Sequence, residues 1–159
     1  NYLRWQIIDT PGILDHSLEE RNVIEMQAIT ALAHLRACVL YVMDLSQQCG
    51  HSIEEQIQLF DNIKPLFQNN PLLLVANKSD ILRFNDLDDQ SKQLINNCLK
   101  ENEKMPFLEM STITDEGVMD VKNKACDNLL EYRVDQKLRT KKVDGILNRL
   151  HVAIPKPRD

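Results

Sequence analysis

Three short polar motifs contain the residue types that could bind and sense a phosphorylated ligand. Each follows an apolar run, and in chain order they are Asp9-Thr10-Pro11-Gly12-Ile13, Asn77-Lys78-Ser79-Asp80 and Ser111-Thr112-Ile113. Alone, each motif is typical of a turn, because aspartate, threonine, proline and glycine are common turn residues. Their order and context favour a shared binding site, since ligands of open α/β sheets bind beyond the carboxyl ends of the strands.

The segments that must position these motifs alternate between strand and helix. Continuous apolar runs predict strands, and apolar residues at helical spacing predict helices between them. The strands are expected at residues 3–8, 38–44 and 106–111 and within 71–80, where a strand runs into the polar turn 77–80. The helices are expected at 17–36, 53–67, around 94–99 and from a Thr114 cap onward. This alternation predicts the α/β class, a doubly wound and mostly parallel sheet with right-handed crossovers.

Composition favours one globular domain, because 43% of the 159 residues are hydrophobic and 27% are charged. The four cysteines lack Cys-x-x-Cys spacing, which argues against a zinc site or a disulfide framework and for a reducing compartment. No apolar run approaches the ~18 residues of a membrane span. We therefore expect no membrane partner.

Charge is distributed unevenly along the chain. The formal net charge is -5, yet the segment from Arg133 to Asp159 holds eight Lys and Arg against three acidic residues. We interpret residues 1–139 as the folded domain and 140–159 as a basic extension or linker. Such a tail favours contact with a polyanion, although a solvated lysine-rich helix would look the same. The candidates for RNA contact are Lys137, Arg139, Lys141 and Lys142.

Asp-x-x-Gly followed by Asn-Lys-x-Asp resembles the signature pair of the translation-factor and Ras-like P-loop GTPases. The resemblance implies GTP or GDP and Mg²⁺ as ligands, and no other small-molecule substrate. Asp80 would accept hydrogen bonds from the guanine N1–H and amine, which adenine cannot supply as a pair. Asn77 would brace the loop, and Lys78 would lay its alkyl stem over the ring.

The same resemblance assigns the other motif residues. Asp9 would hold Mg²⁺ through a water molecule, because Mg²⁺ keeps much of its hydration shell. The Gly12 backbone N–H would approach the γ-phosphate. A backbone donor of the Ser111-Thr112-Ile113 segment would reach the guanine oxygen, although related GTPases usually have Ser-Ala there. All residues of the three motifs are therefore predicted to bind the nucleotide.

A longer resemblance covers nearly the whole chain. The block from Asp9 to Gln56, with "RWQIID" before it and "LNRLHVAIP" near the end, is identified as a member of the nucleolar GTP-binding protein 1 family, relatives of the Obg GTPases. The segment from Phe84 to Met105 fits least. The family implies a GTPase of the nucleus and nucleolus that joins precursors of the large (60S) ribosomal subunit. It implies ribosomal RNA and assembly factors as partners.

The chain contains no Gly-x-x-x-x-Gly-Lys-Ser/Thr loop to cradle phosphates. We therefore expect a C-terminal portion of a GTPase domain, with the phosphate loop and switch I upstream, that binds GTP weakly or not at all by itself. Ile13 stands where Ras-like proteins place the water-orienting glutamine. Slow hydrolysis is expected, with no catalytic residue identified and His16 interpreted as a surface switch histidine.

Two other functions remain open at the level of sequence. The chain could belong to a non-hydrolysing, nucleotide-dependent assembly scaffold of pre-ribosomes. It could also belong to another P-loop class such as an ATPase, which the segment from Asn77 to Asp80 argues against.

Overall fold

The computed structural model describes residues 4–10, 23–102 and 105–149, with the side chains of 23–26, 28 and 141–149 excepted. Within these residues, three parallel strands form one sheet in chain order. The strands are β1 (Val39–Asp44), β2 (Leu72–Asn77) and β3 (Phe107–Glu109), and the α-helices are α1 (Val23–Ala33), α2 (Ile53–Ile63), α3 (Asp89–Glu101) and α4 (Val118–Arg149). Two short 3₁₀ helices, Lys64–Phe67 and Phe84–Asp86, complete the described elements.

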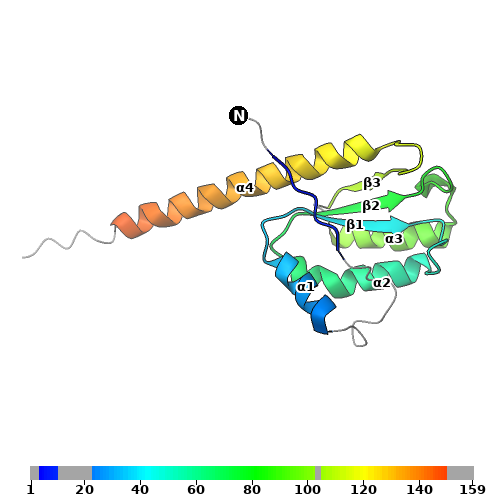
Figure 1. Cartoon of the computed structure of the whole chain (residues 1–159), viewed down its shortest axis with the longest axis horizontal. Coiled ribbons are helices and arrows are strands. Elements are labelled where there is room, and N and C mark those ends of the chain that lie inside the picture. The colour runs from blue at the N-terminus through cyan, green and yellow to red at the C-terminus, as the bar shows by residue number, and fades with distance from the viewer. Residues whose placement is uncertain (1–3, 11–22, 103–104, 150–159) are drawn as a thin grey trace, which may run out of the picture.

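Helices cover both faces of this sheet, as Figure 1 shows. Helices α2 and α3 lie against one face, and the N-terminal part of α4 lies against the other. The doubly wound α/β prediction is therefore confirmed. Strands are also found at the three predicted positions 38–44, 71–80 and 106–111, although β3 has only three residues.

Strand β2 is apolar on both faces because it is covered on both. Leu74 and Ala76 belong to the cluster formed with α2 and α3, whereas Leu73 and Val75 pack with Val121 of α4. Burial of apolar area drives this arrangement at roughly 25 cal/mol per Å². The register pairs the last residue of β1, Asp44, with the last residue of β2, Asn77. The polar segments that follow these strands therefore start side by side.

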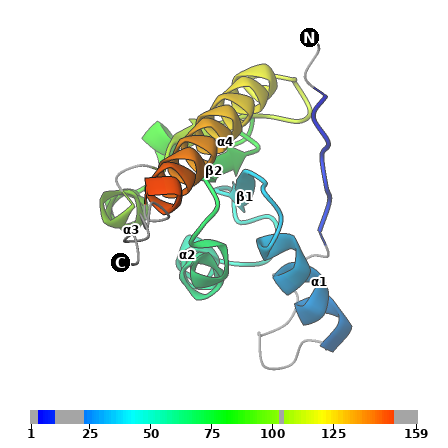
Figure 2. The ribbon, with the colours of Figure 1, turned by 90° about the vertical axis from the view of Figure 1, so that its left-hand side faces the viewer.

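The strand expected at residues 3–8 is not found in its described part, residues 4–8. Residues 4–10 run outside the sheet beyond β1 without joining it, as Figure 2 shows. Ile7 is 92% exposed. A strand is stabilised by cross-strand pairs and by burial, and within the described residues this segment has no cross-strand pair and only Trp5 is partly buried. Its apolar residues alone are therefore insufficient to make it a strand here.

The last helix also begins later than expected. The sequence predicts Thr114 as its cap, but α4 starts at Val118. Asp115 and Gly117 both have positive φ, 60° and 72°, which turns the chain before the helix can start. Helix α4 then continues without a break through Thr140 to Arg149, and its far half projects past the sheet in Figure 1. No change of secondary structure marks the predicted domain boundary at 139, which stays a prediction.

Helix α1 is shorter in the described residues than the predicted 17–36, since it ends at Ala33 and residues 11–22 lie outside the described ranges. Leu35, which lies within the predicted helix, follows the observed helix end and is exposed, whereas Ile29 is buried. Helix α2 begins with a capping box between Ser52 and Glu55. Within the described residues, no helix combines the length and apolarity that crossing a membrane requires.

Candidate functional site

Two of the three predicted motifs meet at the carboxyl edge of the sheet. The segment Asn77–Asp80 follows β2, and Ser111–Ile113 follows β3. Ser79 N–H donates to the Met110 carbonyl at 3.1 Å, and Met110 N–H donates to the Ala76 carbonyl at 2.8 Å. These backbone bonds continue the pairing of β2 with β3 into the loops. The two loops therefore form one unit.

Ser111 holds the carboxylate of Asp80 in place. Its hydroxyl donates to Asp80 Oδ1 and accepts the backbone N–H groups of Ile113 and Thr114, each at 3.2 Å. A hydroxyl has one donor and two acceptor positions, so Ser111, which is fully buried, is saturated. Asp80 itself is exposed, and its Oδ2 has no hydrogen bond among the described residues. One carboxylate oxygen is thus fixed and the other is available to a ligand.

Asn77 links the two loops a second time. Its Oδ1 accepts the Thr112 N–H at 3.3 Å, a long hydrogen bond. Thr112 belongs to the segment from which the sequence predicts a backbone donor to a base oxygen. In the structure that donor is already used, so a ligand oxygen would have to replace Asn77 Oδ1. Because this hydrogen bond is long and therefore weak, replacing it costs little free energy.

Lys78 is oriented by an ion pair across the sheet edge. Its Nζ lies 2.6 Å from Asp44 Oδ2, and the two side chains are 31% and 11% exposed. Asp44 also accepts the N–H groups of Ser46 and Cys49, each at 3.0 Å. Burial raises the pKa of the Asp44 carboxyl, but the hydrogen bonds from Lys78 and Ser46 outweigh it, so this pKa lies below its usual value.

Gln56 of α2 fixes the backbone of Asp44. The Asp44 N–H donates to Gln56 Oε1 at 2.8 Å, and Gln56 Nε2 donates to the Asp44 carbonyl at 2.9 Å and to the His51 carbonyl at 3.1 Å. Gln56 is only 1% exposed, yet all its polar side-chain atoms are bonded. The end of β1 is therefore locked to α2.

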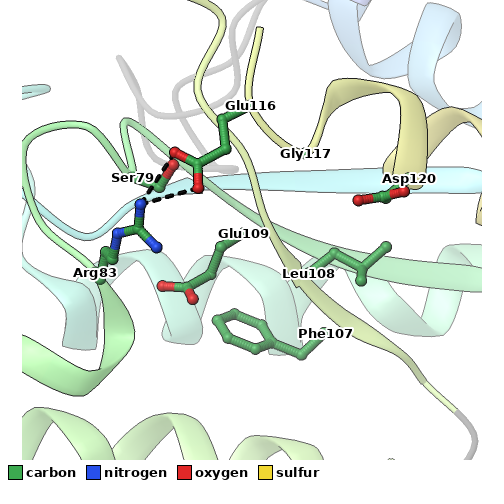
Figure 3. A pocket seen from close by; sticks show the side chains of 8 residues that line it. All are labelled: Ser79, Arg83, Phe107, Leu108, Glu109, Glu116, Gly117 and Asp120. Atoms are coloured by element: carbon green, nitrogen blue, oxygen red, sulfur yellow. Dashed lines mark hydrogen bonds and ion pairs between the residues drawn. The ribbon is translucent and has the colours of Figure 1, made fainter. Parts of the chain in front are cut away.

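A further ion pair closes the outer side of the two loops. Arg83 Nη2 donates to both carboxylate oxygens of Glu116, at 2.9 and 3.0 Å, as the dashed lines in Figure 3 show. The Glu116 carbonyl also accepts the Ser111 N–H at 2.9 Å. Arg83 follows the first loop and Glu116 follows the second, so this pair ties them together. Both side chains are exposed, and we assign the pair less than about 1 kcal/mol.

A cavity of about 370 Å³ lies beside this ion pair (Figure 3). It is lined by Ser79, Arg83, Phe107, Leu108, Glu109, Glu116, Gly117 and Asp120. Neither Asp80 nor Lys78 lines it. The cavity is therefore distinct from the surface where Asp80 Oδ2 is available.

The first motif is described only at Asp9 and Thr10, and among the described residues these two do not contact the other two loops through a hydrogen bond or ion pair. Thr10 N–H donates to Asp9 Oδ1 at 2.9 Å, a turn-like bond, and both residues are exposed. Pro11, Gly12 and Ile13 lie outside the described residues. The described side chains also contain no cluster of three His, Cys, Asp or Glu residues that could hold a metal ion directly.

The fold and the loops define the α/β class of the P-loop GTPases. A parallel sheet covered on both faces presents an Asn-Lys-x-Asp loop and a serine-containing loop at one carboxyl edge. A family model described as Nucleolar GTP-binding protein 1 matches residues 23–80. A solved chain described as a nucleolar GTP-binding protein 1 from Plasmodium falciparum superposes with a TM-score of 0.75 at 39% identity, covering 89% of this chain and 71% of that one. The chain belongs to the nucleolar GTP-binding protein 1 family.

Curated relatives agree over nearly the full chain. The Nucleolar GTP-binding protein 1 of Drosophila melanogaster is 68% identical over 158 residues, and that of Saccharomyces cerevisiae is 52% identical over 159. Each alignment covers 99% of this chain. The chain spans about a quarter of the length of these relatives, 24% in both cases.

Several residues that shape the site did not stand out in the sequence. These are Asp44, Gln56, Arg83, Glu116 and Gly117. One signal was present for Gln56, because it lies three residues after Ile53 and four before Phe60 and so shares the apolar face of the predicted helix. Asp44 was visible only as the end of a strand. Its partner Lys78 lies 34 residues away, and only the strand register brings them together.

Proposed function

We propose that the protein containing this chain binds guanine nucleotides, with the base read by Asp80. The observation that carries the proposal is the half-occupied carboxylate: Oδ1 is held by Ser111, while the exposed Oδ2 has no partner among the described residues. A guanine base offers N1–H and an exocyclic amine side by side. Adenine lacks this donor pair, so it would leave the carboxylate unpaired at a cost of about 1–3 kcal/mol.

The neighbouring residues suit a planar base. The stem of Lys78, anchored at its ammonium by Asp44, can lie along a ring face. The Thr112 N–H can exchange its long bond to Asn77 for a bond to the guanine oxygen. The Ser79 N–H donates to the Met110 carbonyl, which holds the loop backbone, and the Ile113 N–H donates to the Ser111 hydroxyl. In this proposal, Asn77, Ser79 and Ser111 therefore hold the loops, and Asp80, Lys78 and Thr112 meet the base.

Asp9 fits a contact to Mg²⁺ made through water. Its carboxylate is exposed, and only Oδ1 is engaged among the described residues, by the Thr10 N–H. A hydrated Mg²⁺ needs few protein ligands because it keeps several waters and binds nucleotide phosphates. When bound, the ion would neutralise phosphate charge. Thr10, Pro11, Gly12 and Ile13 belong to the same proposed phosphate-facing segment.

We propose slow GTP hydrolysis that acts as a switch or timer during biogenesis of the 60S ribosomal subunit. Ile13 replaces the glutamine that would orient water, so a fast intrinsic reaction is not expected. The name shared by the relatives supports a nucleolar location. The proposed partners are pre-60S particles, ribosomal RNA and assembly factors. Exposed Lys137 and Arg139 on the far half of α4 are the described candidates for RNA contact.

The test of base recognition is Asp80→Asn in the intact gene product. An amide presents one donor and one acceptor, which matches xanthine and mismatches guanine. We expect GDP affinity to fall by about tenfold or more and xanthosine diphosphate affinity to rise. Asp127→Asn on α4 is the control, because Asp127 is exposed and has no bonded partner among the described residues. An unchanged preference for guanine in Asp80→Asn would refute the proposal.

A further inference from the structure

We propose that Asp44 is a positioning residue for guanine-nucleotide binding, acting through Lys78. The inference rests on the proposed function, because it concerns how the base-contacting lysine is held. It adds a residue outside all three sequence motifs to the binding apparatus. Three features support it, namely the conformation of Lys78, the rigidity of Asp44 and the pairing between them.

Lys78 has a backbone conformation that few L-residues adopt. Its φ is 63°, in the left-handed region, and its carbonyl accepts the N–H groups of Ile81 and Leu82 at 2.9 and 3.1 Å. The backbone end of the side chain is therefore fixed. A lysine stem still has four rotatable bonds, so the direction of the stem depends on where its ammonium is held.

Asp44 is the group that holds this ammonium. The 2.6 Å contact between Lys78 Nζ and Asp44 Oδ2 is the only hydrogen bond or ion pair of the Lys78 side chain among the described residues. The Asp44 side chain is largely removed from solvent, so the pair is screened less than a surface pair would be. Both ends of the stem are thus fixed before any ligand binds.

Asp44 is itself held in place, so it cannot move with the Lys78 ammonium. Gln56 brackets its backbone on both the N–H and the carbonyl, and its Oδ2 also accepts the Cys49 N–H. Register pairing with Asn77 places it directly beside the loop that carries Lys78. The position of the Lys78 ammonium is therefore set by β1 and α2. That position in turn fixes the direction of the Lys78 side chain in the Asn77–Asp80 loop.

A second role for Asp44 must be separated from this one, because its carboxylate also caps the loop that follows β1. A double-mutant cycle in the intact gene product makes the distinction. The variants are Asp44→Asn, Lys78→Met and the double substitution, and the readout is the dissociation constant for a fluorescent GDP. Methionine keeps an unbranched apolar side chain but has no charge to pair. Asp127→Asn is again the control.

We expect each single substitution to weaken GDP binding by about tenfold and the double variant to bind no more weakly than Lys78→Met alone. Multiplying effects would show that Asp44 acts through its loop and would overturn the inference. An unchanged affinity in Asp44→Asn would overturn it as well. The Asp80→Asn experiment separates these failures from a failure of the proposed function, since it tests base recognition without touching the pair.

Lys78→Arg keeps the inference testable if Asp44→Asn does not fold. A guanidinium can retain the ion pair with Asp44, whereas methionine cannot. We expect Lys78→Arg to bind GDP more tightly than Lys78→Met, by about threefold or more. Equal affinities of the two variants would show that the pair does not position the stem, and the inference would be wrong.

Discussion

Asp80 and Asp44 are both aspartates at the carboxyl edge of the sheet, but their surroundings give them different tasks. Asp80 is exposed and keeps one oxygen available, as expected of a group that meets a ligand. Asp44 is buried and uses both oxygens within the protein, as expected of a group that positions others. Residue type alone would not separate them. The hydrogen-bond partners do.

The depressed pKa of Asp44 predicts how its contribution to stability depends on pH. The Asp44 pKa in the folded state lies below the unfolded-state pKa near 3.9. The stabilisation of the fold by the charged carboxylate is therefore complete at pH values above the unfolded-state pKa. It is lost as the pH falls through the folded-state pKa. At pH 7, Asp44→Asn should lower the free energy of unfolding by about 1–3 kcal/mol. The difference between wild type and variant should shrink below about pH 4.

Urea unfolding of the intact protein at several pH values measures this effect. Asp127→Asn serves as the control for removing one acidic charge from an exposed position. A difference between wild type and Asp44→Asn that stays constant from pH 7 to pH 3 would contradict the assigned role of the charged carboxylate.

At the scale of elements, the turn between β3 and α4 depends on one glycine. Gly117 has a φ of 72°, and a Cβ placed there would lie 2.3 Å from the Glu109 carbonyl oxygen of β3. Gly50 has a similar φ of 86°, but no atom lies within 4 Å of its Cβ position. Alanine is strained at both positions, by about 1–2 kcal/mol. Only at Gly117 does it also collide with a strand.

We therefore expect Gly117→Ala to destabilise the sheet by about 1–3 kcal/mol more than Gly50→Ala. Hydrogen exchange of the β2 and β3 amides, measured by mass spectrometry in both variants, reports this difference locally. Equal protection in the two variants would mean that β3 shifts to accommodate the methyl group, and the close approach would then have no energetic consequence.

The elements differ in how far sequence could predict them. Strands β1 and β2 were predictable because each is a continuous apolar run, and α2 because Ile53, Phe60 and Ile63 repeat at helical spacing. The strand prediction for residues 3–8 was wrong over 4–8, because an apolar pattern does not show whether a neighbouring strand is present to pair with. Thr114 failed as a cap because the left-handed turn at Asp115 and Gly117 delays the helix.

The candidate site was predictable only in part, for a related reason. The Asn77–Asp80 and Ser111–Ile113 segments are local patterns that follow strands, so the chain order suffices to find them. The contacts of Lys78 with Asp44 and of Arg83 with Glu116 join residues more than 30 positions apart. They depend on strand register and loop geometry, which periodicity does not encode.

At the scale of the whole molecule, the acidic body and the basic end of the chain meet along one helix. Helix α4 packs on the sheet through Val121 near its start, while its far half extends away from the sheet in Figure 1. The exposed Lys137 and Arg139 lie on that far half, and neither forms an ion pair among the described residues. Cations held away from an acidic body suit a polyanionic partner.

If the far half of α4 contacts ribosomal RNA, replacing Lys137 and Arg139 with alanine should weaken binding of a large-subunit RNA fragment by the intact protein. The slope of log affinity against log salt should also become shallower, by roughly 0.7–0.9 for each phosphate that the variant no longer neutralises. Lys122→Ala with Lys124→Ala is the matched control, because both lysines are exposed on the near half of the same helix. That pair should leave affinity and slope nearly unchanged. An equal reduction in both double variants would show that charge alone, and not its place on α4, governs RNA binding.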